Sequence, residues 1–223
     1  MGEHSAVGAA GDSDPPPTRS DGRRPVGRPR RLDDRAERRQ LLDAGYRALR
    51  DEGPGFTIAN ILDLAGVSTR SFYRQFASKD ALLCAMYRQD SDWVVRRIVD
   101  RLARADGARA RVETWVDEVF AMVREPARAE RTAVFGAAMA SRAGVLAEEA
   151  ARTRRQMVEP LRSAIGDGVA DGLFHTSDPS GDADLIAAVT LHAAGLGPST
   201  AATTEHDPAG VVSFALRALG HTG

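Results

Sequence analysis

After residue 33, apolar residues recur at steps of three and four positions along most of the chain, which is the spacing of one helix face. In the first such segment the arginines fall largely on the other side of the turn, and the segment ends at Gly53-Pro54-Gly55. Its apolar positions are Leu41, Leu42, Gly45, Ala48 and Leu49. No segment alternates convincingly between apolar and polar residues, as a half-buried strand would. The pattern therefore predicts an all-α fold.

Two short helices joined by a glycine turn are predicted next. Thr57 can cap the first and Ser68 the second, because a hydroxyl oxygen accepts a bond from a free main-chain N–H at a helix start. Between them, Gly66 tolerates the positive φ of a tight turn. Ser78 then caps a long fourth helix that reaches Ile98. The apolar faces of the short helices are Ile58, Ile61, Leu62 and Ala65 in the first, and Phe72 and Phe76 in the second.

The rest of the chain divides into five further helical segments at joints rich in glycine, proline, serine or threonine. They are expected at roughly 108–124, 127–142, 144–172, 181–196 and 207–219. No internal repeat is found.

Composition agrees with helices packed through aliphatic side chains, since 43% of residues are hydrophobic and only 5% aromatic. Cys84 is the single cysteine, so no internal disulfide can form. No apolar stretch is long enough to span a membrane or to act as a secretory signal, which leads us to expect a cytoplasmic protein. The net charge of −1 hides a basic segment, because residues 19–31 hold six arginines and one acid.

A second helix, a glycine turn and a third helix with exposed Arg, Thr and Tyr are the parts of a helix-turn-helix. Such hairpins also occur in unrelated bundles, so the residue sequence has to decide. Residues 57–82, TIANILDLAGVSTRSFYRQFASKDAL, closely resemble the TetR family signature, and with Leu41-Leu42-Asp43-Ala44 the resemblance covers about residues 35–85. It departs from the family at Leu62, where a small residue is usual, and in the connection at 53–56, which looks one residue short.

Residues 1–32 are rich in Gly, Pro, Ser, Asp and Arg and show no apolar periodicity, so we expect a flexible basic arm there. The resemblance implies a helix-turn-helix DNA-binding domain at 33–85 and a helical ligand-binding and dimerisation domain at 86–223. It implies a homodimeric transcriptional repressor that leaves a palindromic operator when a small, largely apolar ligand binds. An architectural or constitutive DNA-binding protein without an inducer stays open as the alternative.

By the same resemblance the third helix lies in the major groove. Thr69, Arg70 and Arg74 are candidates for base edges, and Arg70 suits guanine best because a guanidinium can bond O6 and N7 together. Tyr73 and Lys79, the only lysine, match phosphate-contacting positions. The predicted DNA-contacting set is Arg28, Arg30, Thr57, Ser68, Thr69, Arg70, Ser71, Tyr73, Arg74 and Lys79.

The basic arm has a motif of its own. Residues 24–31, RPVGRPRR, resemble an AT-hook, whose Gly-Arg-Pro core lies extended along the minor groove. Arg28 and Arg30 would then enter a narrow A·T-rich groove. A solvated basic tail that only adds salt-dependent attraction is the equally weighted alternative.

Other chemistries find no support in the sequence. The five histidines are scattered and Cys84 stands alone, so no metal site is expected. No nucleophile elbow, P-loop or dinucleotide-binding motif occurs. We expect no cofactor and no enzymatic activity.

The later helices, by the family resemblance, enclose an apolar cavity and supply a dimer interface from the last two segments. Arg131 and His192 are the candidate polar anchors for a ligand, although a lone histidine on an apolar face is more often a core residue. The candidate ligand-binding residues are Trp115, Val119, Met122, Arg131, Phe135, Met139, Met157 and His192. The candidate interface residues are Leu185, Ile186, Val189, His192, Ala193, Val211, Val212, Phe214, Ala215, Leu216 and Leu219.

Overall fold

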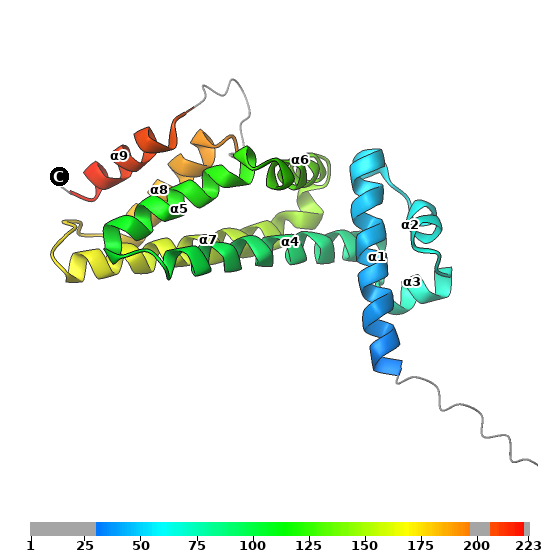
Figure 1. The fold of residues 1–223 in the computed structure, drawn as a ribbon. Coiled ribbons are helices and arrows are strands. Elements are labelled where there is room, and N and C mark those ends of the chain that lie inside the picture. The colour runs from blue at the N-terminus through cyan, green and yellow to red at the C-terminus, as the bar shows by residue number, and fades with distance from the viewer. Residues whose placement is uncertain (1–29, 197–205, 221–223) are drawn as a thin grey trace, which may run out of the picture.

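The computed structural model describes residues 30–196 and 206–220, with side chains from residue 34 onward. These residues form nine α-helices, one short 3-10 helix and no strand, so the predicted all-α fold is confirmed (Figure 1). In chain order the elements are α1 (Arg30–Glu52), η1 (Gly53–Gly55), α2 (Ile58–Ala65), α3 (Thr69–Gln75), α4 (Lys79–Leu102), α5 (Gly107–Arg124), α6 (Pro126–Ser141), α7 (Ala143–Ala170), α8 (Pro179–Ala193) and α9 (Pro208–Ala218).

The predicted helix boundaries hold to within a few residues. Proline opens α6, α8 and α9, because its missing N–H lies where no helical partner exists and its fixed φ already suits a helix. The helix α1 begins at Arg30, earlier than the predicted start at 33. No glycine or proline lies between Arg30 and Gly45, so nothing in the first turns delays the helix.

The helices bury two separate cores. The C-terminal core is built on α4, α5, α7, α8 and α9, with Trp115 and Leu161 fully buried. The N-terminal core holds the buried faces of α1 to α3 and the first half of α4, including Phe56 and Phe72.

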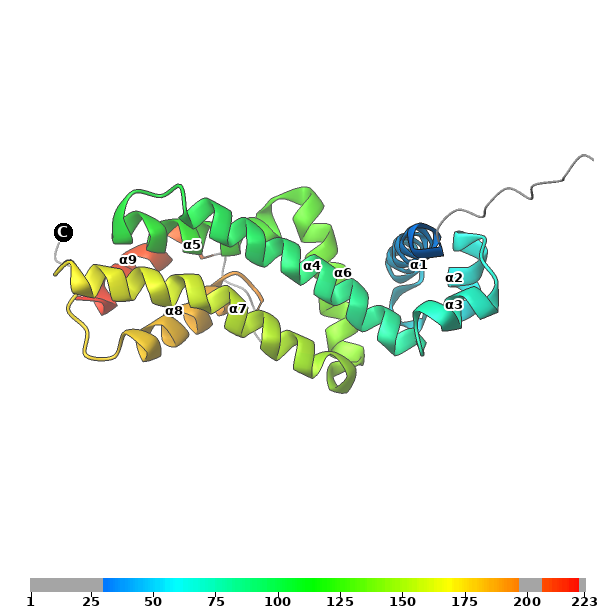
Figure 2. The ribbon, with the colours of Figure 1, turned by 90° about the horizontal axis from the view of Figure 1, so that it is seen from below.

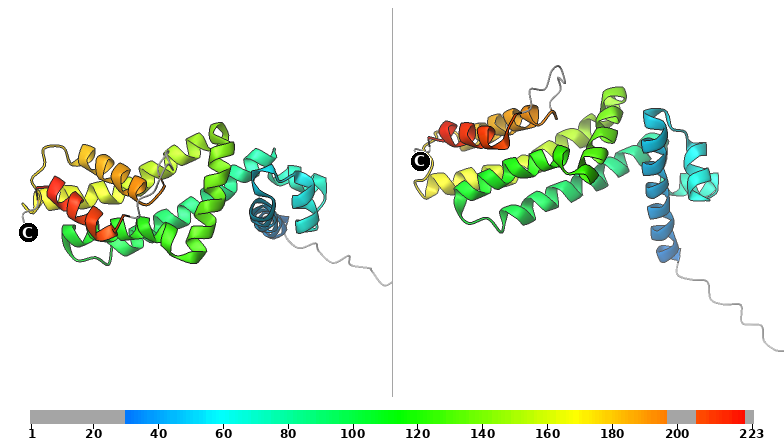
Figure 3. Two further views of the ribbon diagram at one scale, coloured as in Figure 1. Left: turned by 90° about the horizontal axis from the view of Figure 1, so that it is seen from above. Right: turned by 45° about the horizontal axis from the view of Figure 1, so that its top comes forward.

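The N-terminal core is not closed by the first helices alone. Phe135 and Ala138 of α6 and Leu146 of α7 belong to it. Figure 3 shows α6 crossing the end of the bundle that faces α1. The predicted domain boundary at residue 85 falls inside α4, which runs without a break from the helix-turn-helix into the bundle (Figure 2).

Ion pairs join α4 to the helices beside it. Asp80 pairs with Arg142 at 2.6 Å and Asp92 with Arg152 at 2.8 Å, and both arginines lie at or after the start of α7. The start and the middle of α4 are therefore joined to the α6–α7 junction and to α7 by charge as well as by apolar packing. Within the described residues, no helix is both long and apolar enough to cross a membrane.

Candidate nucleic-acid interface

Side-chain caps and one left-handed glycine define the helix-turn-helix. The Thr57 hydroxyl accepts the Asn60 N–H at 3.2 Å, and the Asn60 carboxamide accepts the Thr57 N–H at 2.8 Å, which completes a capping box at the start of α2. Gly66 ends α2 at φ 63°, and the Ser68 hydroxyl accepts the Ser71 N–H at 3.2 Å at the start of α3. The predicted turn and both predicted caps are confirmed.

Polar side chains of α1 fix the other ends of the two short helices. The last carbonyls of a helix have no partner within it. Gln40 Nε2 donates to the Ala65 carbonyl at 2.5 Å, and an Arg47 guanidinium nitrogen donates to the Leu64 carbonyl at 2.8 Å. Arg38 likewise donates to the Gln75 carbonyl at 3.1 Å and lies 4.3 Å from the centroid of the Phe76 ring. Sequence reasoning placed the α1 arginines on a polar face but missed this role.

Three side chains of α3 point to solvent together. Phe72 is fully buried and anchors the helix, and its ring meets the ring of Tyr73 edge-to-face at 5.3 Å. Thr69, Arg70 and Tyr73 are exposed, Tyr73 by 53%. Within the described part of the chain, Arg70 makes no ion pair, so its guanidinium is available to a partner.

Arg74 and Ser71 face α1 instead. Arg74 pairs with Glu37 and lies 3.6 Å from the Asp34 carboxylate. A hydrogen bond from Ser71, with Arg74 and Gln75, holds the pKa of Glu37 below its usual value despite partial burial. The structure therefore does not place these two predicted contact residues beside Thr69, Arg70 and Tyr73.

Lys79 is already bound within the protein. Its Nζ donates to the Phe56 carbonyl at 2.6 Å and lies 4.7 Å from the centroid of the Phe56 ring. Burial and the nearby Arg142 lower the pKa of Lys79. The ammonium ties the start of α4 to the turn before α2.

The described residues include only the end of the predicted minor-groove arm. Arg28 lies outside them, and Arg30 is described only as the first backbone position of α1. The extended backbone expected for residues 24–31 is wrong at Arg30 and Arg31, which are helical, and residues 24–29 lie outside the described part of the chain.

Comparison with known proteins agrees with this geometry. Residues 41–86, which span the second half of α1, all of α2 and α3 and the start of α4, match the family model described as bacterial regulatory proteins, tetR family. This region of the chain belongs to the TetR family. The match places it among transcriptional regulators, which bind DNA, and not among enzymes.

Solved TetR-type structures share the fold over the rest of the chain. A TetR transcription regulator from Haloarcula marismortui has a TM-score of 0.64 and 21% identity, covering 83% of this chain and 97% of that one. The fatty acid degradation regulator FadR from Bacillus halodurans has a TM-score of 0.66 and 16% identity over the same shares. FadR from Bacillus subtilis, solved in complex with stearoyl-CoA, has a TM-score of 0.61 and 14% identity over 81% and 96%. A comparison of the sequence with curated proteins gives no match.

The predicted ligand residues fall into three places. Trp115, Val119 and Met157 lie in the C-terminal core, with Met122 packed against it, and Trp115 Nε1 donates to the Met157 carbonyl at 2.8 Å. Phe135 and Met139 belong instead to the N-terminal core.

The two predicted polar anchors are on the surface. Arg131 is exposed, pairs with Asp90 at 3.0 Å and lies 5.2 Å from the centroid of the Tyr46 ring. His192 is exposed on α8. The structure therefore brings together only the four residues at the C-terminal core.

Two open grooves mark the described surface. One, of about 690 Å³, lies between α5 and α9, with Val212 and Leu216 beside the charged groups of Glu113 and Asp117. The other, of about 600 Å³, lies between η1 and the α6–α7 junction, next to Arg142. Neither groove is lined by a predicted ligand residue. Among the described residues, no group of three or more His, Cys, Asp or Glu could hold a metal ion.

Proposed function

We propose that this TetR-family protein is a ligand-responsive repressor that binds palindromic operator DNA as a homodimer and leaves it when a small, largely apolar molecule binds. The observation that carries the DNA part is the face of α3 formed by Thr69, Arg70 and Tyr73. These side chains are exposed on a helix that is fixed at its start by Ser68 and at its end by Arg38. A rigid helix with exposed polar groups is what major-groove recognition needs.

Within this face the roles differ by chemistry. Arg70 is the base-reading residue in this proposal, because its free guanidinium suits the two acceptors of guanine. Tyr73 contacts a phosphate and sets the register of the helix on DNA. Arg74 would first have to leave Glu37 and Asp34, so it takes second place to Arg70.

Apolar side chains on the last two helices support the homodimer. Leu185 and Val189 of α8 are 66% and 39% exposed, and Phe214 of α9 is 44% exposed. His192 lies on the same side of α8 as Leu185 and Val189, at steps of four and three residues. Pairing this face with its symmetry mate would bury it and place two copies of α3 on one palindrome.

An apolar ligand fits the composition of the C-terminal domain. Its core consists of aliphatic and aromatic side chains, and the flexible side chains of Met157 and Met122 can change rotamer to make room for a ligand. A structural neighbour of this chain was solved with stearoyl-CoA, which makes a long acyl chain the first class to try. A ligand that prefers one position of the DNA-binding domains would shift the protein away from operator binding.

Selection of binding sites from a random duplex library, followed by fluorescence anisotropy, tests the DNA part. Arg70→Ala should weaken binding to the selected site, since a bidentate arginine contact is worth about 1–3 kcal/mol, or roughly 5- to 150-fold. Arg154→Ala, which removes an exposed arginine from α7, is the matched control and should leave affinity unchanged. The Arg70 variant should also lose the preference for one base at the positions that Arg70 reads. Unchanged affinity and sequence preference in that variant would refute the assignment.

The ligand part is tested by titrating stearoyl-CoA, stearate and a panel of smaller apolar acids against the protein–operator complex. Release of DNA by one of them, with the reciprocal loss of its affinity when operator is bound, is the expected result. A compound that binds tightly and leaves operator affinity unchanged would favour the constitutive DNA-binding alternative.

A further inference from the structure

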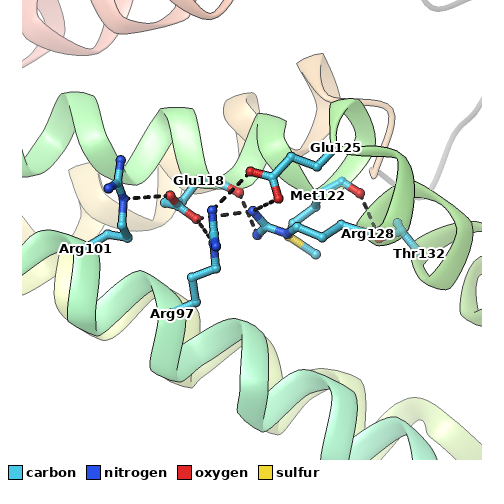
Figure 4. Close-up of polar contacts among 7 residues, drawn as sticks. All are labelled: Arg97, Arg101, Glu118, Met122, Glu125, Arg128 and Thr132. Atoms are coloured by element: carbon cyan, nitrogen blue, oxygen red, sulfur yellow. Dashed lines mark hydrogen bonds and ion pairs between the residues drawn. The ribbon is translucent and has the colours of Figure 1, made fainter.

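A buried carboxylate joins three helices at the middle of the molecule. Glu118 of α5 has a side chain only 5% exposed, and it accepts hydrogen bonds from Arg97 Nε at 2.8 Å and from Arg101 Nε at 3.1 Å, both on α4 (Figure 4). A nitrogen of Arg128 on α6 reaches the same carboxylate at 3.2 Å. Arg128 is itself only 7% exposed, and its second terminal nitrogen donates to the Glu118 main-chain carbonyl at 3.2 Å.

Glu125 is the second acid of this cluster but lies at its edge. It pairs with Arg97 at 3.0 Å and with Arg128 at 3.5 Å, and its side chain is 46% exposed. Arg128 Nε, in contrast, is buried without a hydrogen-bond partner. Arg128 therefore depends on Glu118 for most of the compensation of its buried charge.

One face of α6 connects this cluster to the DNA-binding domain. Arg128 lies at its start and contacts Glu118, and one turn later the Thr132 hydroxyl donates to the Met122 carbonyl of α5 at 3.0 Å. The next turns bring Phe135 and Ala138, which are buried in the N-terminal core. The spacing of three or four residues puts all these groups on one side of the helix.

The far end of this face makes specific aromatic contacts. The Phe135 ring meets the rings of Tyr46 on α1 and Tyr87 on α4 edge-to-face at 5.8 and 5.4 Å. The Tyr46 hydroxyl donates to the Met86 carbonyl at 2.7 Å. A displacement of α6 would thus directly change the contacts of α1, which holds the ends of α2 and α3.

We propose that Glu118 is a positioning residue for DNA binding: by fixing Arg128 it holds α6, and through α6 it sets the position of the helix-turn-helix. In Glu118→Gln the charge that compensates Arg128 is gone, so the guanidinium moves toward water and carries the start of α6 with it. The contacts of Phe135 in the N-terminal core then loosen. This inference rests on the proposed function, because its main readout is operator affinity.

The test compares Glu118→Gln with Glu125→Gln in the full-length protein. Each removes one negative charge from the same cluster, but only Glu118 is buried. Glu118→Gln should weaken operator binding, with an effect in the range of about 5- to 150-fold that is typical of coupling between distant sites. Glu125→Gln should leave it within about twofold, since exposed ion pairs contribute little. Equal effects of the two variants, or none from Glu118→Gln, would overturn the proposal.

A double variant separates positioning from simple loss of stability. In Glu118→Gln alone, Arg128 is left as a buried charge without its main partner. Adding Arg128→Gln removes that charge together with the ion pair between α5 and α6, so the midpoint of thermal unfolding should recover toward the wild-type value. Operator affinity should stay low, because α6 is no longer fixed. Recovery of affinity in parallel with thermal stability would show that Glu118 acts only through stability.

Hydrogen exchange in the free protein supplies a readout that needs no operator. Glu118→Gln should raise exchange in α6 and in residues 41–76, whereas Glu125→Gln should not. If wild-type protein selects no DNA site, the proposed function fails while this exchange difference still tests the α6 connection. If DNA binds but exchange and affinity match wild type, the Glu118 proposal alone fails.

Discussion

The Lys79 ammonium donates a 2.6 Å hydrogen bond to the Phe56 carbonyl, which joins the first residue of α4 to the turn before α2. A charged donor on a partly buried carbonyl is one of the stronger hydrogen bonds, worth about 1.5–3 kcal/mol. The same ammonium matches a position predicted to reach phosphate. The ammonium has three N–H donors and only one is used on the Phe56 carbonyl, so the salt dependence of DNA binding has to decide whether it also contacts a phosphate.

We expect the bond to Phe56 to persist on DNA. Lys79→Met should then lower the free energy of unfolding by about 1.5–3 kcal/mol, measured by urea denaturation. The slope of log affinity against log salt should stay unchanged. A slope that becomes shallower by about 0.9 for each protomer would mean that the ammonium neutralises a phosphate.

We expect the ion pair with Glu37 to control whether Arg74 can reach DNA. Glu37→Gln removes the nearer of the two carboxylates that hold Arg74 on α1, so the guanidinium should reach phosphate more easily, and the salt slope should steepen by up to about 0.9 per protomer. In an Arg74→Ala background the same substitution should have no effect on the slope. A change of equal size in both backgrounds would exclude Arg74 as the cause.

The pKa of Glu37 gives this pair a pH dependence. Because the folded-state pKa is lowered from 4.5, the pair stabilises the protein above that value, and its contribution is lost as pH falls through the lowered folded pKa. The difference in unfolding free energy between wild type and Glu37→Gln should therefore shrink below pH 4.5 and level off above it. A difference that grows with acidity would contradict the sign of the shift.

Local signals could be predicted from the sequence far better than contacts between distant helices. Thr57, Gly66 and Ser68 act on their own backbone, so residue type and spacing were enough to place the helix-turn-helix. Helical periodicity shows which face is buried but not what covers it. Phe135 was therefore assigned to a ligand cavity although it joins the N-terminal core.

The same limit explains the candidate sites that did not come together. Nothing in the sequence singles out Glu118, and only the approach of α4 and α6 makes it the centre of a cluster. Arg74 reads as a free arginine on α3 until α1 brings Glu37 to it. His192 could have been placed better, because it shares its side of α8 with Leu185 and not with buried Ile186.

Two glycines of α7 provide a matched test of packing in the C-terminal domain. At Gly168 an added methyl group would overlap the buried Phe174 ring, whereas at Gly166 it would meet nothing within 4 Å. Gly168→Ala should lower the free energy of unfolding by about 1–3 kcal/mol through overpacking. Gly166→Ala should raise it by about 0.5–1 kcal/mol, since alanine favours a helix more than glycine does. Equal shifts in urea denaturation would mean that α7 and Phe174 do not pack as described.

The exposed face of α8 provides the test of dimerisation. Leu185 is 66% exposed in the single chain, and a glutamate there would place a charge at the centre of the proposed interface without touching either core. Leu185→Glu should therefore yield a folded monomer by sedimentation velocity and circular dichroism. It should also lose most of its affinity for a palindromic site, because two linked copies of α3 are needed to span successive half-sites.

The control is Val99→Glu, which places the same charge on an exposed apolar position of α4. It should leave both mass and operator affinity as in the wild type. A monomer produced by both variants would point to a general effect of surface charge, and a dimer that persists in Leu185→Glu would move the interface away from α8. Affinity for a single half-site separates the loss of dimerisation from damage to the DNA-binding face. A monomer with an intact Arg70 should bind a half-site with the same weak affinity as one protomer of the wild type.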